Sequence, residues 1–165
     1  MNKNNELIQQ MILYYAGDPK RIQHFLKVYE FAKLIGEAEQ LDSQTQHILE
    51  TAAIVHDIGI KNAEAKFGNC NGKLQEQEGP APARELLSSL KYAPDVIDRV
   101  CYLVAHHHTY QNVNGSDYQI LLEADFLVNL YEDGLDSSAA SNARKNIFRT
   151  NTGITICKTM FGLSE

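Results

Sequence analysis

An apolar stretch that ends in a histidine and an aspartate constrains the fold of this chain more than any other segment. Residues 48–55 read Ile-Leu-Glu-Thr-Ala-Ala-Ile-Val, and His56 and Asp57 follow directly. The apolar side chains cover a broad surface of a helix, as in a central helix that other helices surround. Because a buried carboxylate is costly unless something pairs with it, Asp57 requires a partner.

A divalent metal ion satisfies a histidine and an aspartate at once. Imidazole nitrogen and carboxylate oxygen are suitable ligands for zinc, manganese, iron and nickel. The pair alone does not establish a site, because the end of a helix often carries both residue types. Its meaning depends on what polar residues the rest of the chain provides.

Helical periodicity recurs along the chain, whereas strand patterns are weak. About seven helices are predicted, which indicates an all-α bundle forming a single domain over residues 1–165. Residues 61–79 are polar and contain three glycines, so this segment is predicted to be a long loop. The predicted helices cover approximately residues 19–36, 42–59, 80–90, 94–105, 117–128, 137–148 and 152–161.

Composition narrows the classes of function. The 165 residues suit one compact domain, and a 44% apolar content is typical of globular proteins. A net charge of −6 disfavours binding to a nucleic acid polymer, which usually requires a basic face. Three widely spaced cysteines indicate reduced thiols and a cytoplasmic location. No stretch approaches the about 18 apolar residues of a membrane span, and the polar N-terminus lacks a signal-peptide pattern.

Further polar residues lie beside apolar helical surfaces. They are His24, Glu78, Asp125 and the run His106–His108. Singly, each has an ordinary explanation, such as a hydrogen-bonded core histidine, a loop carboxylate or a solvated helix end. Together, they match a bundle in which several helices each contribute inward nitrogen or oxygen ligands to a metal ion. Four such ligands with positions left for water are typical of a catalytic ion.

The order of these residues resembles the His…His-Asp…Asp signature of the HD-domain metal-dependent phosphohydrolase superfamily. The signature residues here are His24, His56, Asp57 and Asp125. About 30 residues separate the first histidine from the pair and about 70 separate the pair from the last aspartate, as in that family. The segment Ala-Ala-Ile-Val-His-Asp-Ile-Gly also resembles the family's sequence around its pair. The resemblance covers roughly residues 20–130 and is more specific for fold and metal site than for substrate.

The resemblance implies a site for one divalent metal ion, which is manganese, iron, nickel, cobalt, zinc or magnesium. Its ligands are expected to be His24, His56, Asp57 and Asp125. Family members with two ions have a further histidine after the pair, and the segment around residues 75–82 has none. Glu78 occupies about the corresponding place, and His106, His107 or His108 would match later positions that bind a second ion or the substrate. One ion is therefore expected rather than two.

The activity that the resemblance implies is hydrolysis of a phosphate ester or phosphoanhydride, of a nucleotide or related small molecule, by metal-activated water. Asp57 would help to orient the water. Lys61 and one of the histidines, among them His107 and His108, would bind phosphate or protonate the leaving oxygen. The expected partner is a small phosphorylated substrate, and a homodimer through residues 132–165 is also compatible with the sequence.

Two other functions are compatible with the same fold. A di-iron oxygenase would need a second ion, and the absent histidine counts against it. A non-catalytic module that senses a nucleotide would not need the intact ligand set. In a nucleotide site, Phe67, Tyr110 and Tyr118 would stack on a base; otherwise these residues of the polar loops pack over the core.

Overall fold

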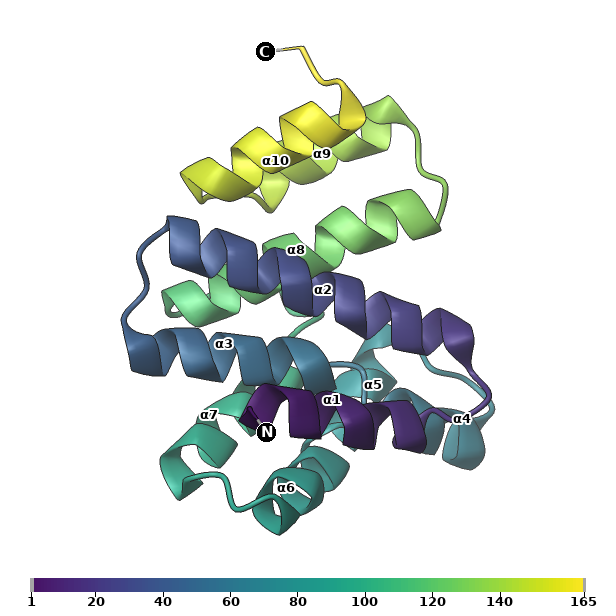
Figure 1. The fold of residues 1–165 in the computed structure, drawn as a ribbon. Helices are drawn as coiled ribbons and strands as arrows, with labels where there is room; N and C mark the ends of the chain where they lie inside the picture. Colours follow the sequence, from purple (N-terminus) through teal and green to yellow (C-terminus); the bar gives the residue numbers. More distant parts are fainter. Residues whose placement is uncertain (1, 165) are drawn as a thin grey trace.

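The computed structural model describes residues 2–164 and is entirely helical over this range, which confirms the prediction of an all-α fold (Figure 1). Ten helices are present in the described residues, rather than the seven predicted. They are α1 (Lys3–Tyr14), α2 (Pro19–Ala38), α3 (Ser43–Val55), α4 (Ile60–Phe67), α5 (Gly72–Glu78), α6 (Pro80–Ser89), α7 (Pro94–Val104), α8 (Ser116–Glu132), α9 (Ser137–Asn146) and α10 (Asn151–Phe161).

The three additional helices are α1, which the sequence did not predict, and α4 and α5, which occupy the predicted loop. Helix α4 ends at Gly68, whose φ of +63° is left-handed and favours glycine. Helix α5 begins after Asn71, whose side chain accepts a hydrogen bond from the backbone nitrogen of Leu74. The prediction of a long loop over residues 61–79 is wrong, because these two short helices, of which α4 is mostly exposed and α5 mostly half-buried, have the composition of a loop.

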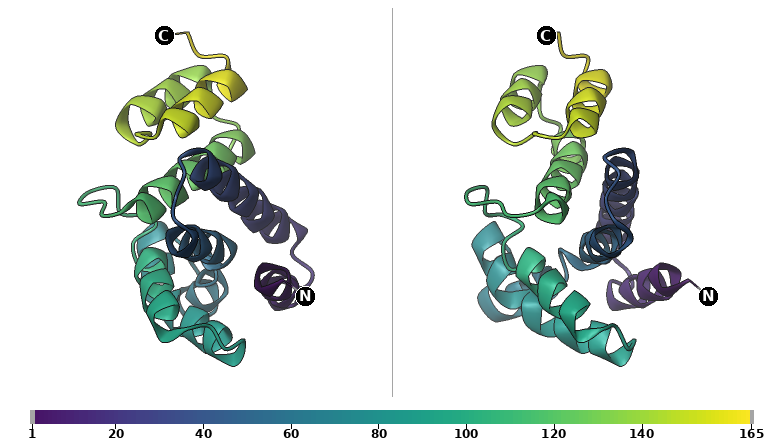
Figure 2. Two further views of the ribbon diagram at one scale, coloured as in Figure 1. Left: turned by 60° about the vertical axis from the view of Figure 1, so that its left-hand side comes forward. Right: turned by 90° about the vertical axis from the view of Figure 1, so that its left-hand side faces the viewer.

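Helix α3 lies at the centre of the bundle. Helices α1, α2, α7 and α8 all pack against it (Figure 2). Ile48, Leu49 and residues 51–55 are buried, as expected of a central helix. The helix begins after Asp42, whose carboxylate accepts hydrogen bonds from two backbone nitrogens, and it ends at Val55. His56 and Asp57 therefore lie at the first positions beyond it, inside the bundle.

Gly59 does not stop this helix through a left-handed conformation, because its φ is −73°. Its role is to allow a close approach between two parts of the backbone. A Cβ atom at Gly59 would lie 2.6 Å from the carbonyl oxygen of Gln75 and 2.6 Å from the backbone nitrogen of Gly79. The turn after the His56-Asp57 pair is thereby packed directly on the end of α5, which brings Gln75 next to the pair.

The remaining helices cover the two ends of the bundle. Helices α6 and α7 pack together at one end, and α9 and α10 lie over α8 at the other (Figures 1 and 2). Glu123 of α8 joins this second layer to the core, because its buried carboxylate accepts hydrogen bonds from the backbone nitrogens of Arg149 and Thr150 at 2.7 and 2.9 Å. Among residues 2–164, no helix is both long enough and apolar enough to cross a membrane.

Candidate metal centre

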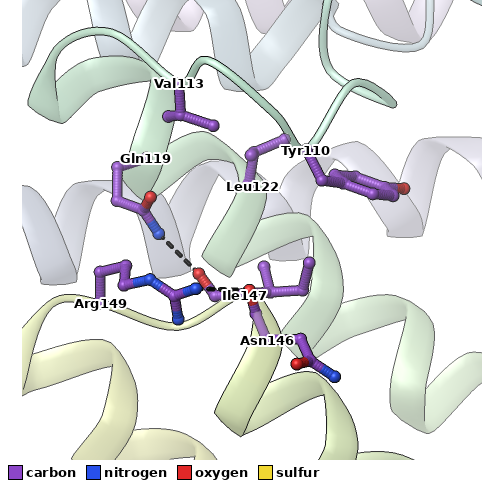
Figure 3. Close-up of a pocket in the computed structure, with 7 residues that line it drawn as sticks. All are labelled: Tyr110, Val113, Gln119, Leu122, Asn146, Ile147 and Arg149. Carbon is purple, nitrogen blue, oxygen red and sulfur yellow. Dashed lines mark hydrogen bonds between the residues drawn. The ribbon is translucent and has the colours of Figure 1, made fainter.

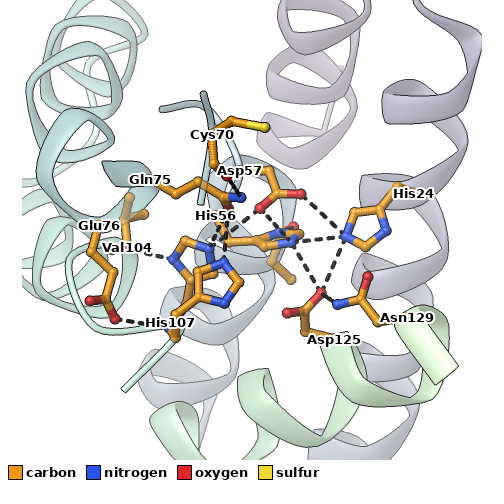
Figure 4. Close-up of polar contacts among 12 residues, drawn as sticks. His24, His56, Asp57, Cys70, Gln75, Glu76, Val104, His107, Asp125 and Asn129 are labelled. Atoms are coloured by element: carbon orange, nitrogen blue, oxygen red, sulfur yellow. Dashed lines mark hydrogen bonds and ion pairs between the residues drawn. The ribbon is translucent and has the colours of Figure 1, made fainter. Parts of the chain in front are cut away.

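The four residues of the sequence signature converge on one point. His24 comes from α2, His56 and Asp57 from the turn after α3, and Asp125 from the middle of α8 (Figure 4). The Nε2 atom of His24 lies 3.2 Å from Nε2 of His56, 3.2 Å from a carboxylate oxygen of Asp125 and 3.3 Å from one of Asp57. The Nε2 atom of His56 lies 3.5 Å from an oxygen of each aspartate. We call these four residues the metal-ligand cluster.

The Nδ1 atom of each of the two histidines contacts a group outside the cluster, and this contact fixes the orientation of the ring. The Nδ1 atom of His56 lies 2.8 Å from the carbonyl oxygen of Ala53, to which it donates. The Nδ1 atom of His24 lies 2.9 Å from a carboxylate oxygen of Glu132. A neutral imidazole that donates from Nδ1 keeps a lone pair on Nε2. With an ion bound, both histidines would be neutral and would direct these lone pairs into the cluster, which is the usual arrangement of histidines that bind a metal.

The cluster attracts positive charge. Burial lowers the pKa of His24, but the hydrogen bond with Asp125 and the negative charges of Asp57 and Asp125 outweigh burial and raise this pKa to about 9. Burial raises the pKa of Asp125, yet its hydrogen bonds with His24 and His56 hold that pKa well below the usual range. Two imidazole nitrogens and two carboxylates gathered in a largely buried site are a donor set that fits a divalent ion.

A second group of donors shares Asp57. The Nε2 atom of His107 lies 3.4 Å from a carboxylate oxygen of Asp57, and its Nδ1 donates to the carbonyl oxygen of Val104. Donor atoms of Asp57, His107 and His108 lie within 4.8 Å of one another. The amide oxygen of Gln75 lies 3.3 Å from Nε2 of His107 and 2.8 Å from Nε2 of His108. His107 and His108 thus flank the same carboxylate that faces His24 and His56.

Three other residues predicted for the site lie away from the cluster. Glu78 forms an ion pair with a lysine of α4. The ammonium group of Lys61 donates to the carbonyl oxygen of Tyr14 at 3.0 Å. His106 stacks on the ring of Tyr102, and its Nδ1 is bonded to the carbonyl oxygen of that residue. The structure therefore joins His107 and His108 to the four signature residues, and leaves Glu78, Lys61 and His106 elsewhere.

Sequence reasoning missed the residues that support the cluster. The side-chain nitrogen of Asn129 donates to a carboxylate oxygen of Asp125 at 2.9 Å. Asp125, Asn129 and Glu132 are spaced at i, i+4 and i+7, so the helical period alone would have placed them on one face of α8. The hydroxyl of Tyr15 donates to the carbonyl oxygen of Asp57 at 2.6 Å. No local signal marks this tyrosine, because the contact depends on how α1 packs.

A pocket with a volume of about 370 Å³ opens onto the cluster. His24, Asp57 and Asp125 contribute to its wall, together with His108 and residues from the start of α2 and the end of α8. Burial and the neighbouring His107 lower the pKa of His108 to about 4, so this imidazole is neutral at pH 7. The pocket therefore gives a small molecule access to the donor atoms of the cluster and to a neutral histidine beside them.

The sequence and structure are similar to those of known proteins. A sequence model described as the HD domain matches residues 21–140. The fold is similar to the crystal structure of a predicted HD superfamily hydrolase from an uncultured Thermotogales bacterium, with a TM-score of 0.68 and 21% sequence identity. That alignment covers 96% of this chain and 84% of the other. No curated protein matches the sequence.

Proposed function

The chain belongs to the HD domain family, and we propose that it is a metal-dependent phosphohydrolase acting on a small phosphate ester or phosphoanhydride. The observation that carries this proposal is the convergence of His24, His56, Asp57 and Asp125 beside an open pocket. These four residues would hold one divalent ion. The solved structure with the similar fold is described as a predicted hydrolase of the same superfamily, which supports the choice of reaction class.

When bound, the ion would lower the pKa of a water molecule from 15.7 towards about 7 and neutralise charge on the phosphoryl oxygens. Asp57 has the most exposed side chain of the cluster, at 17%, and lines the pocket, so its carboxylate would also orient the attacking water. His108 lies in the same pocket and is neutral at pH 7. It would supply a hydrogen bond to the phosphoryl group or to the leaving oxygen, without adding charge.

We propose one ion per chain rather than two. The segment around residues 75–82 contains no histidine that could serve as a further ligand, and Glu78, the carboxylate in the corresponding place, is paired with a lysine of α4. The alternatives differ in measurable quantities. Two irons per chain together with oxygen consumption would favour the di-iron oxygenase, and tight nucleotide binding without turnover would favour the sensing module.

The proposal is tested by measuring metal content and phosphate release for the wild type, His56→Ala and Asp57→Ala. A panel of phosphate esters and anhydrides is used as substrate. Loss of a residue that only supports a metal ligand costs about 10- to 100-fold in metal affinity or activity. We expect His56→Ala and Asp57→Ala, which each remove a ligand, to lose more than this in both ion binding and phosphate release. The matched control is His47→Ala, because His47 stacks on Tyr92 outside the cluster.

The control is expected to keep its ion and its activity. Circular dichroism verifies that all three variants remain helical. A wild type that binds no ion, combined with an Asp57→Ala variant whose activity is unchanged, would show that the proposal is wrong.

A further inference from the structure

The pocket beside the metal-ligand cluster is small, and most of the residues that line it are polar or charged. Its volume of about 370 Å³ lies near the lower end of the roughly 300–1,000 Å³ that is usual for ligand pockets. Ile60 provides an aliphatic part of the wall, whereas most of the other side chains are charged or carry an amide or an imidazole. Such a wall fits a compact, hydrophilic molecule.

No phenylalanine or tyrosine of the described residues lines this pocket. Tyr118 is buried, and its hydroxyl lies within hydrogen-bond distance of two backbone carbonyl oxygens. Phe67 is exposed at the end of α4. Tyr110 lines a separate pocket between α8 and the turn from α9 to α10, where Arg149 donates to the backbone carbonyl oxygen of Asn146 (Figure 3). A nucleobase in the pocket of the cluster would therefore have no phenylalanine or tyrosine ring to stack on, and the imidazoles that line the pocket, His24 and His108, are already bonded to Glu132 and Gln75.

Helix α8 instead presents hydrogen-bond acceptors to the pocket. The side-chain nitrogen of Asn129 donates to Asp125, which leaves its side-chain oxygen able to accept. Asp133 lies four residues further along and also lines the pocket. Within residues 2–164, no hydrogen bond or ion pair engages the carboxylate of Asp133 or the ammonium group of Lys20, which lines the pocket from α2. Arg21, by contrast, is held by two carboxylates.

We infer that the substrate is a phosphate monoester of a small aliphatic polyhydroxy compound, such as a sugar phosphate. Its hydroxyl groups donate to Asn129 and Asp133, while Lys20 supplies positive charge for the phosphate. Hydroxyl groups suit these acceptors, and a site built to bind a hydroxyl rejects an analogue that lacks it. The inference rests on the proposed function, because the pocket adjoins the same cluster.

The experiment compares kcat/KM for ribose 5-phosphate, AMP and phenyl phosphate, using protein loaded with Mn²⁺. AMP carries the same phosphorylated ribose with a base added, and phenyl phosphate has no hydroxyl group outside its phosphate. We expect ribose 5-phosphate to be preferred over AMP by about 10-fold or more. Asp133→Ala is expected to raise KM for ribose 5-phosphate by about 10-fold, the effect of losing one hydrogen bond to a charged group, and to leave phenyl phosphate unchanged. Glu30→Ala, on the exposed face of α2, is the matched control.

The outcomes separate the two proposals. If none of the three esters is hydrolysed while another ester or an anhydride of the panel is, the inference alone is overturned, whereas a panel without any turnover makes the proposed function fail and the inference with it. If AMP is hydrolysed at least as well as ribose 5-phosphate, the inference alone is overturned. A preference for AMP that disappears in Tyr110→Leu would place the base in the second pocket and would also overturn it. An equal fall in kcat/KM for all three substrates in Asp133→Ala would show that Asp133 does not recognise the hydroxyl groups of the substrate.

Discussion

At the scale of single residues, the orientation of His24 depends on a chain of contacts outside the cluster. Lys27 lies 2.7 Å from one carboxylate oxygen of Glu132, and the other oxygen lies 2.9 Å from Nδ1 of His24. Burial raises the pKa of Glu132, but its bonds with Lys27 and His24 outweigh this and lower that pKa. Glu132 thus remains ionised and accepts the Nδ1–H of His24, which orients the ring so that Nε2 faces the other three residues of the cluster.

Removing this support should weaken ion binding without removing a ligand. We expect Glu132→Ala to raise the Kd for Mn²⁺ by about 10- to 100-fold, the usual cost of losing a partner of a metal-bound histidine. Glu132→Gln keeps a hydrogen-bond acceptor and should lose less. Isothermal titration calorimetry measures the Kd, with Glu30→Ala as the control. An unchanged Kd in Glu132→Ala would mean that His24 needs no partner on Nδ1.

At the scale of elements, the turn after α3 and the junction between α5 and α6 meet backbone to backbone at Gly59 and Gly79. This contact carries α5 to the cluster, where Gln75 and Glu76 hold the turn that bears His108. A carboxylate oxygen of Glu76 accepts hydrogen bonds from the backbone nitrogen of His108 and from the hydroxyl of Thr109, at 2.9 and 2.8 Å. Helix α5, which lies in the segment with the composition of a loop, therefore positions His108.

A methyl group at Gly59 should force this junction apart. Because its Cβ would lie 2.6 Å from two backbone atoms, which cannot move aside like a flexible side chain, we expect Gly59→Ala to lower the free energy of unfolding by about 1–3 kcal/mol. Urea denaturation measures the loss. Lys73→Ala, at an exposed position of α5, is the control and should unfold like the wild type. Equal midpoints for the two variants would contradict the close approach.

At the scale of the whole molecule, the sequence predicted the helices that have a clear apolar period and the residues that belong to the family signature. Helical periodicity located seven of the helices, and the spacing of His24, His56, Asp57 and Asp125 identified residues that the fold brings together. The directions of side chains in short helices were not predictable. Glu78 ends α5 beside the expected position, yet it faces a lysine of α4. Contacts such as Tyr15 with Asp57 depend on packing between helices, which no local pattern encodes.

The proposed ion should also stabilise the bundle, because its expected ligands come from α2, from the turn after α3 and from α8. An ion that binds only the folded chain adds about 2.7 kcal/mol at 100 times its Kd. For a domain of this size, that corresponds to a rise of about 5–10 °C in Tm. Differential scanning calorimetry with Mn²⁺ and with EDTA measures the difference. The rise should be absent in His56→Ala and retained in His47→Ala, and an equal rise in His56→Ala would place the ion elsewhere.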